Sequence, residues 1–158
     1  MNPFKLSYQA LMCDNVAEKI KQVDQLHQLK DLAKLDYQLT HPVKPVKYPG
    51  RPNKPILARF NAMPKRGKSD LGFIETIHAI CHIEFNAINL ALDAVYRFHG
   101  MPSQFYQDWV QVAFEEAQHF QLLNNYLVEL GYQYGDFDAH NGLWKMTVET
   151  DYDVLARM

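Results

Sequence analysis

The fold can be predicted outward from residues 84–120, which read EFNAINLALDAVYRFHGMPSQFYQDWVQVAFEEAQHF. Gly100 and Pro102 interrupt a helical pattern of apolar residues here, and glycine after one helix and proline before the next are the usual stop and start signals. The pattern on either side predicts two long helices, over residues 70–99 and 103–130. Because the connection between them is so short, we expect the two helices to be antiparallel neighbours.

Each of these helices carries a glutamate in the middle of its apolar stripe. At about 100° per residue, Glu84 lies in line with the apolar residues of the first helix and Glu116 with those of the second. The adjacent Glu115 points about 100° away, toward polar residues, so the two consecutive glutamates have opposite expected environments. The stripe residues around the two central glutamates are Ile77, Cys81, Ile88, Ala91 and Val95 on the first helix, and Phe105, Trp109, Val112, Leu123, Leu127 and Leu130 on the second.

Carboxylates inside an apolar stripe need a cation, a hydrogen-bond network or a proton, because burying them unpaired is costly. Between residues 69 and 143, Arg97 is the only lysine or arginine, and it projects onto the polar side of its helix. A metal ion is therefore the simplest counter-charge, although an arginine partner or a raised pKa is the alternative for a single buried glutamate. The E-x-x-H sequence from Glu116 to His119 places a carboxylate and an imidazole one turn apart. With Glu84 opposite, it forms half of a carboxylate-bridged dinuclear site, and its oxygen-rich ligation suits iron or manganese.

Three segments of the chain closely resemble the bacterial family catalogued as DUF455, which has a ferritin-like domain. They are HAICHIEFNAINLALDAVYRF (78–98), MPSQFYQDWVQVAFEEAQHFQLLNNYL (101–127) and YGDFDAHNGLW (134–144), and the PGRP segment and the TDYDVLARM ending also fit. The resemblance covers nearly the whole chain and implies a ferritin-like four-helix bundle with a di-iron-type site. The wider superfamily includes rubrerythrins, ferritins and a tRNA-modifying hydroxylase. By the family's pattern, Glu84, Glu116 and His119 are the ligands of the first half of the site.

One departure from the family concerns the second half of the site. Family members continue past the position of Met158 into further helices with another glutamate and a second E-x-x-H, so we expect this ferritin-like domain to be incomplete. Either the chain is a shortened version, or another molecule supplies the missing ligands. Two copies related by a twofold axis would contribute two E-x-x-H motifs, which leads us to expect a homodimer.

Three other residues are weaker candidates for the metal site. His82 lies at the edge of the apolar face and begins a polar row with Asn86, Asn89 and Asp93. This row forms a polar seam against another element, or His82 orients a metal ligand by a hydrogen bond. His140 sits in a loop with two aspartates, where a turn is the competing interpretation. Glu149 lies on a third expected helix, where a solvated acidic face explains it equally well.

The rest of the chain divides into a basic front and an acidic back. Residues 1–68 hold 13 Lys and Arg against 5 Asp and Glu, whereas residues 69–158 hold 3 against 13, which together give the net charge of −2. We expect a first helix over residues 9–29 and an extended arm over residues 41–68, which contain six of the eight prolines. The division into residues 1–68 and a helical domain over 69–158 follows from this change.

The arm is expected to wrap the surface of the domain and to bury Tyr48, Ile56, Leu57, Phe60 and Met63. Ser103 is the expected N-cap of the second long helix, and Gly131 its end. A polar loop over 132–143 should lead into a third helix that runs from Trp144 to Met158.

Composition narrows the classes of function. No apolar run approaches the roughly 18 residues of a membrane span, and the first residues lack a secretory core, so we expect a cytoplasmic protein. The arm could neutralise phosphates, but it has no recognised RNA-binding motif, and we favour its lying against the acidic helices. The candidate functions are an oxygen- or peroxide-dependent iron or manganese oxidoreductase of unknown substrate, iron binding without catalysis, a metal-free helical interaction module, and a relative of the RNA-modifying hydroxylase.

Overall fold

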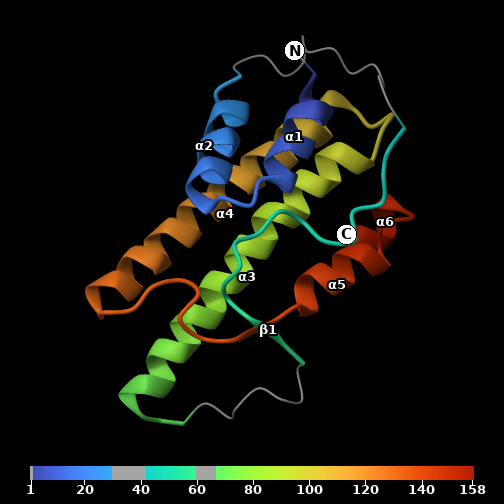
Figure 1. Cartoon of the computed structure of the whole chain (residues 1–158). Helices are drawn as coiled ribbons and strands as arrows, with labels where there is room; N and C mark the ends of the chain where they lie inside the picture. The colour runs from blue at the N-terminus through green and yellow to red at the C-terminus, as the bar shows by residue number, and fades with distance from the viewer. Residues whose placement is uncertain (1, 30–41, 60–66) are drawn as a thin grey trace.

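The structure is a computed structural model that describes residues 2–29, 42–59 and 67–158. Two long antiparallel helices form its centre, α3 (Asp70–Arg97) and α4 (Ser103–Glu129) (Figure 1). The shorter helices are α1 (Pro3–Met12), α2 (Val16–His27), α5 (Gly142–Glu149) and α6 (Val154–Arg157). Within the described ranges the only strands are β1 (Leu57–Ala58) and β2 (Ala139–His140), which pair in parallel. The prediction of a mostly helical fold is confirmed.

The turn between α3 and α4 is held by a tyrosine side chain. The hydroxyl of Tyr106 donates to the carbonyl of Phe98 at 3.0 Å and accepts from the amide of Met101 at 3.1 Å. The prediction that Ser103 is the N-cap is wrong, because Ser103 is already the first helical residue and Pro102 is the N-cap. The carbonyl of Pro102 accepts from the amide of Phe105 at 3.0 Å.

The other end of α4 matches the prediction. Gly131 lies just beyond the helix with φ of +84°, a left-handed conformation that favours glycine. The next amide, of Tyr132, donates to the carbonyl of Leu127 at 2.9 Å and closes the helix end.

The N-terminal segment forms two helices, so the prediction of one helix over residues 9–29 is wrong. The chain breaks at residues 13–15, and the side chain of Asn15 caps α2 by accepting from the amide of Glu18 at 2.9 Å. This break lets α1 pack on α3 while α2 packs on α4 (Figure 1). The apolar period continues across the break, which is why the sequence pattern alone does not reveal it.

A buried lysine joins α1, α2 and α3. The ammonium group of Lys19 donates to the carbonyls of Ala10 and Leu11, each at 2.9 Å, and to the Oδ1 atom of Asn89 at 2.7 Å. Three acceptors match the three N–H groups of an ammonium, and two of them are carbonyls at the open end of α1. Burial lowers the pKa of Lys19 to about 7, and these three hydrogen bonds favour the protonated form.

The described part of the proline-rich arm, residues 42–59, is extended, as predicted, and lies across α3 (Figure 1). The amide of Lys44 donates to the hydroxyl of Tyr96 at 2.7 Å, and the carbonyl of Lys47 accepts from the indole of Trp144 at 3.0 Å. The prediction that Tyr48 and Ile56 are buried is wrong.

The side chains of Tyr48 and Ile56 are exposed, because the arm is anchored chiefly through its backbone. Leu57 is half-buried, while Phe60 and Met63 lie outside the described residues.

The basic side chains of this part of the arm do not form ion pairs with any carboxylate in the described ranges. Arg51 donates instead to the carbonyl of Pro55 at 3.0 Å, and the ammonium of Lys47 lies 5.4 Å from the ring centre of Tyr48. Any balance between the charge of the arm and that of the acidic helices is therefore not made by direct pairs in this part of the chain.

The C-terminal segment also breaks, so the prediction of one helix from Trp144 to Met158 is wrong. After α5 ends at Glu149, Asp153 starts α6 by accepting from the amides of Leu155 and Ala156 at 2.8 and 3.2 Å. The new direction of the chain carries Arg157 back to α3, where it meets Asp93.

The buried apolar residues of α1 and α2 belong to the same core as those of α3 and α4. This core includes Phe4, Leu11 and Val23 from the N-terminal helices. The division of the chain at residue 68 stays a prediction. Among the described residues, no helix is long and apolar enough to cross a membrane.

Candidate metal centre

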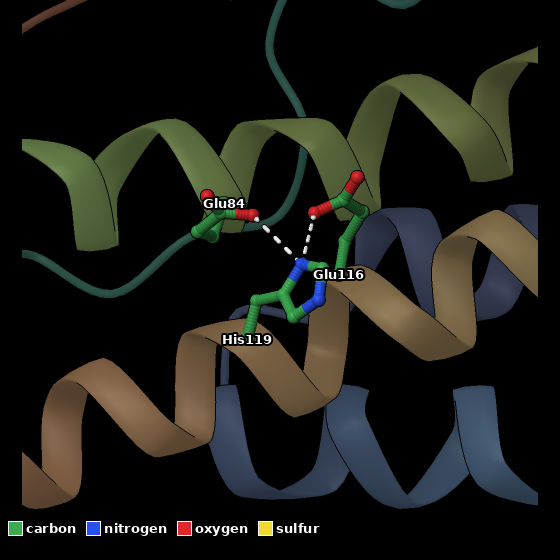
Figure 2. Close-up of side chains that lie close together, drawn as sticks. All are labelled: Glu84, Glu116 and His119. Atoms are coloured by element: carbon green, nitrogen blue, oxygen red, sulfur yellow. Dashed lines mark hydrogen bonds and ion pairs between the residues drawn. The ribbon is translucent and has the colours of Figure 1, made fainter.

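Two carboxylates and one imidazole meet between the central helices (Figure 2). Glu84 comes from the middle of α3, and Glu116 and His119 come from the middle of α4. One ligand atom of each residue lies within 4.8 Å of the others. The Nδ1 atom of His119 faces both carboxylates, at 3.1 Å from Oε2 of Glu116 and 3.5 Å from Oε2 of Glu84. The three residues with the strongest sequence signal are thus brought together.

The cluster is more open than the apolar stripes suggest. The exposed fraction of the side chain is 19% for Glu84, 24% for Glu116 and 56% for His119. The prediction that both glutamates are buried in the middle of an apolar stripe is therefore wrong in degree. The stripe residues Cys81 and Ile88 are fully buried, but Ile80, which lies beside the stripe, is 39% exposed, so the side of α3 on which Glu84 lies is only partly covered.

Glu116 affects the protonation of Glu84. The pKa of Glu84 rises to about 7, first because partial burial penalises its charge, and then because of the hydrogen bond and charge of Glu116. The hydrogen bond with Glu116 raises the pKa of His119. In the described part of the chain, no lysine or arginine pairs with either carboxylate. The cluster therefore concentrates acidic groups around one imidazole.

Arg97 does not serve as their partner. Its side chain pairs at 2.8 Å with Asp93, a member of the polar row of α3, so it lies on the polar side as predicted, although it is only 10% exposed. Burial opposes its charge, but Asp93 keeps the pKa of Arg97 raised.

The contrast between Glu115 and Glu116 is confirmed. Glu115 is exposed and accepts a hydrogen bond from the side-chain amide of Gln111 at 2.8 Å, away from the cluster. Two adjacent glutamates of the same helix therefore differ in environment, which makes Glu115 a matched control for Glu116.

The weaker candidates do not join the cluster. His82 is buried and its ring contacts the hydroxyl of Tyr134 at 2.8 Å and the amide of Asn86 at 3.0 Å, and burial lowers its pKa to about 4. His140 lies in β2, and its Nδ1 atom accepts from the amide of Gly142 at 3.1 Å. Glu149 forms an exposed ion pair with Lys145 at 3.7 Å.

The polar row on α3 is a seam with three different partners. His78 and His82 hold the loop after α4, because His78 accepts from the amide of Gly135 at 2.9 Å. Further along the helix, Asn89 binds Lys19 and Asp93 binds Arg157. Sequence reasoning missed Lys19, although its position midway between Val16 and Val23 in an apolar stripe was a usable signal.

The fold and the cluster together define a class: a helical protein with a Glu–Glu–His cluster held between two antiparallel helices. The chain matches the family model described as "Protein of unknown function (DUF455)" over residues 12–158, and it belongs to that family. A Haemophilus influenzae protein named "Uncharacterized protein" is 50% identical over 115 residues, which cover 68% of this chain and 40% of that protein. The chain thus spans less than half the length of this relative. No solved structure matches the chain.

Proposed function

We propose that this protein binds iron or manganese through Glu84, Glu116 and His119 and is an oxidoreductase of the ferritin-like, carboxylate-bridged dinuclear class. The observation that carries the proposal is the meeting of three ligand atoms within 4.8 Å, from residues on two different helices. Two carboxylates lie close together beside a single imidazole, and the charge of Glu116 contributes to the raised pKa of Glu84. A cation would relieve their repulsion directly.

The chemistry of the donors fits this metal class. Two carboxylates and one imidazole form a hard, oxygen-rich set that suits iron or manganese better than a metal that prefers thiolates. The thiol of Cys81 lies outside the cluster and donates to the carbonyl of Phe120 at 3.8 Å. Bound iron or manganese would supply the redox chemistry with oxygen or peroxide.

The protein's own part is to position these ligands. The E-x-x-H spacing keeps Glu116 and His119 on one face of α4, and the antiparallel partner holds Glu84 opposite them. The side chain of His119 is 56% exposed, so the cluster is accessible to solvent from one side. A small oxidant could therefore reach it without any movement of the helices.

Metal analysis tests the binding step. The protein should be purified from cells grown with added iron and, separately, manganese, and the metal content of wild type, Glu116→Ala and Glu115→Ala should be measured. We expect Glu116→Ala to lose the metal and Glu115→Ala to retain it. Unchanged metal content in Glu116→Ala would overturn the assignment. A wild-type protein without metal would instead favour the helical interaction module.

A second measurement tests the redox step. Oxygen or peroxide is added to the reduced, iron-loaded protein while its absorbance is followed. An absorbance change that Glu84→Ala abolishes and Glu115→Ala leaves intact supports an oxidoreductase. Bound iron without any change supports iron binding without catalysis.

A further inference from the structure

A cleft of about 780 Å³ opens between the proline-rich arm and α5. On the arm side it is lined by Lys47, Tyr48 and Arg59, and on the α5 side by Trp144 and Lys145. Its volume is in the range of pockets that hold small molecules. None of the three residues of the Glu–Glu–His cluster lines it, so this arm–α5 cleft is separate from the candidate metal centre.

Hydrogen bonds to the backbone of the arm hold the two sides of the cleft together. The indole of Trp144 donates to the carbonyl of Lys47 at 3.0 Å, and the amide of Ala139 donates to the carbonyl of Ile56 at 3.0 Å. Because β2 pairs with β1 just before α5 begins, the segment that leads to Arg59 lies beside the start of α5 (Figure 1). The cleft is therefore part of the fold and needs no rearrangement to form.

Positive charge is concentrated at this cleft. Of the three Lys and Arg in residues 69–158, the two arginines bind Asp93, whereas Lys145 lines the cleft. The arm adds Lys47 and Arg59 from the other side, and neither forms an ion pair with a carboxylate of the described ranges. An anion that enters the cleft would meet three basic side chains.

A single carboxylate opposes this charge among the described residues that line the cleft. Glu149 lies 3.7 Å from the ammonium group of Lys145, and the two side chains are 63% and 74% exposed. Exposed ion pairs of this kind contribute little energy, so Lys145 can exchange the carboxylate for a bound anion.

Apolar and aromatic side chains separate the charges. Trp144 and Val148 of α5 and Ala58 of the arm line the cleft between them. Tyr48 is 59% exposed, and the ammonium group of Lys47 lies 5.4 Å from the centre of its ring. An exposed aromatic ring can stack on the base of a nucleotide while neighbouring cations bind the phosphate. The cleft therefore fits a ligand with a flat ring and a negative charge.

We propose that the arm–α5 cleft binds a small nucleotide, whose base stacks on Tyr48 and whose phosphate is held by the three basic side chains. The guanidinium group of Arg59 offers paired N–H donors that match the oxygens of a phosphate. An RNA strand would need positive charge along a continuous track, but Arg51 of the arm donates to the carbonyl of Pro55 at 3.0 Å. The grouping of charge at one cleft favours a free nucleotide over RNA.

Isothermal titration calorimetry of the full chain, kept free of metal with a chelator, tests the binding. AMP and UMP are the purine and pyrimidine probes, and adenosine and inorganic phosphate represent the two parts of AMP. We expect both nucleotides to bind, and adenosine and phosphate each to bind at least about tenfold more weakly than AMP, because ring and phosphate contribute separately. The proposal is overturned if neither nucleotide binds at millimolar concentration, or if adenosine binds as tightly as AMP.

Matched variants locate the ligand in the cleft. Tyr48→Ala should weaken AMP binding at least about fivefold, whereas Tyr152→Ala, at a tyrosine that is 78% exposed elsewhere, should leave it unchanged. Arg59→Ala should weaken AMP binding about tenfold, whereas Lys44→Ala, at an exposed arm lysine outside the cleft, should leave it unchanged. Equal effects of the cleft variants and their controls would exclude this cleft.

One variant should improve binding. Glu149→Gln removes the carboxylate that competes with phosphate for Lys145, so AMP should bind about two- to fivefold more tightly. Damage to the fold cannot produce such a gain, and an affinity no higher than that of wild type would contradict the position of the phosphate. Bulk tRNA that binds more tightly than AMP, and loses this binding in Arg59→Ala, would show an RNA site and overturn the proposal of a small nucleotide.

Discussion

Asp93 is expected to be the most sensitive charged residue for stability, because it fastens the end of the chain to α3. Its side chain is 1% exposed and accepts from Arg97 Nε and Nη2 at 2.9 and 2.8 Å and from Arg157 Nη1 at 2.9 Å. The guanidinium of Arg157 is itself fully buried and also donates to Thr147 and Thr150. Asp93→Ala would leave this buried cation without a carboxylate.

The size of the effect follows from this geometry. Removing one partner of a buried ion pair lowers the free energy of unfolding by about 3–5 kcal/mol, because the other charge stays buried and uncompensated. Asp151 also pairs with Arg97, at 3.6 Å, but it is 36% exposed. Asp151→Ala should therefore cost less than about 1 kcal/mol and serves as the control.

Urea unfolding followed by far-ultraviolet circular dichroism measures these differences. In the double variant Asp93→Ala/Arg157→Met the fully buried cation is removed, while Arg97 keeps its contact with Asp151. The double variant should therefore be less destabilised than the sum of the single variants by about 1–3 kcal/mol. A loss below about 1 kcal/mol for Asp93→Ala, or strict additivity in the double variant, would refute the reasoning.

Three further predictions concern other parts of the chain. Burial lowers the pKa of Lys19 from 10.5 to about 7. Between these two pH values the folded state binds fewer protons than the unfolded chain, so the free energy of unfolding increases with pH. Below pH 7 the folded state carries the full cost of burying the charged ammonium group, and this cost is relieved as the pH rises. The stability of wild type relative to Lys19→Met should therefore increase from pH 7 to pH 10 in urea unfolding, and a constant difference would contradict this. Tyr106→Phe removes two hydrogen bonds from the α3–α4 turn and should lower the free energy of unfolding by about 1–3 kcal/mol. Calorimetry would show this as a lower melting temperature. A melting temperature equal to that of wild type would exclude the role of this hydroxyl. Because the arm over residues 41–68 lacks a recognised RNA-binding motif, bulk tRNA should cause no gel shift at low salt, and a shift that disappears with added salt would reverse that expectation.

The central helix pair could be predicted because its signals are local. The end of α4 is set by Gly131, and the connection to α3 is short enough to impose an antiparallel arrangement. Given that arrangement, helical periodicity places Glu84 opposite Glu116, and one helical turn separates Glu116 from His119. The candidate site needed no information beyond these short-range rules.

The breaks at the two ends of the chain could not be predicted from the period. Asn15 and Asp153 each cap a new helix with the side chain, but such residues are also common on exposed helix faces. Whether the chain turns there depends on what the next segment can pack against. In this structure that support comes from α4 for the first break and from Asp93 for the second.

The amino-acid sequence alone was enough to establish the helical class, the pairing of α3 with α4 and the shared location of Glu84, Glu116 and His119. Periodicity, capping and one-turn spacing act over a few residues, so they can be recognised without knowing the fold. Tertiary structure decided the rest: Lys19 meets Asn89 across 70 residues, and Asp93 meets Arg157 across 64. It also left the cluster open on one side, because the exposure of a helix face depends on which other elements cover it.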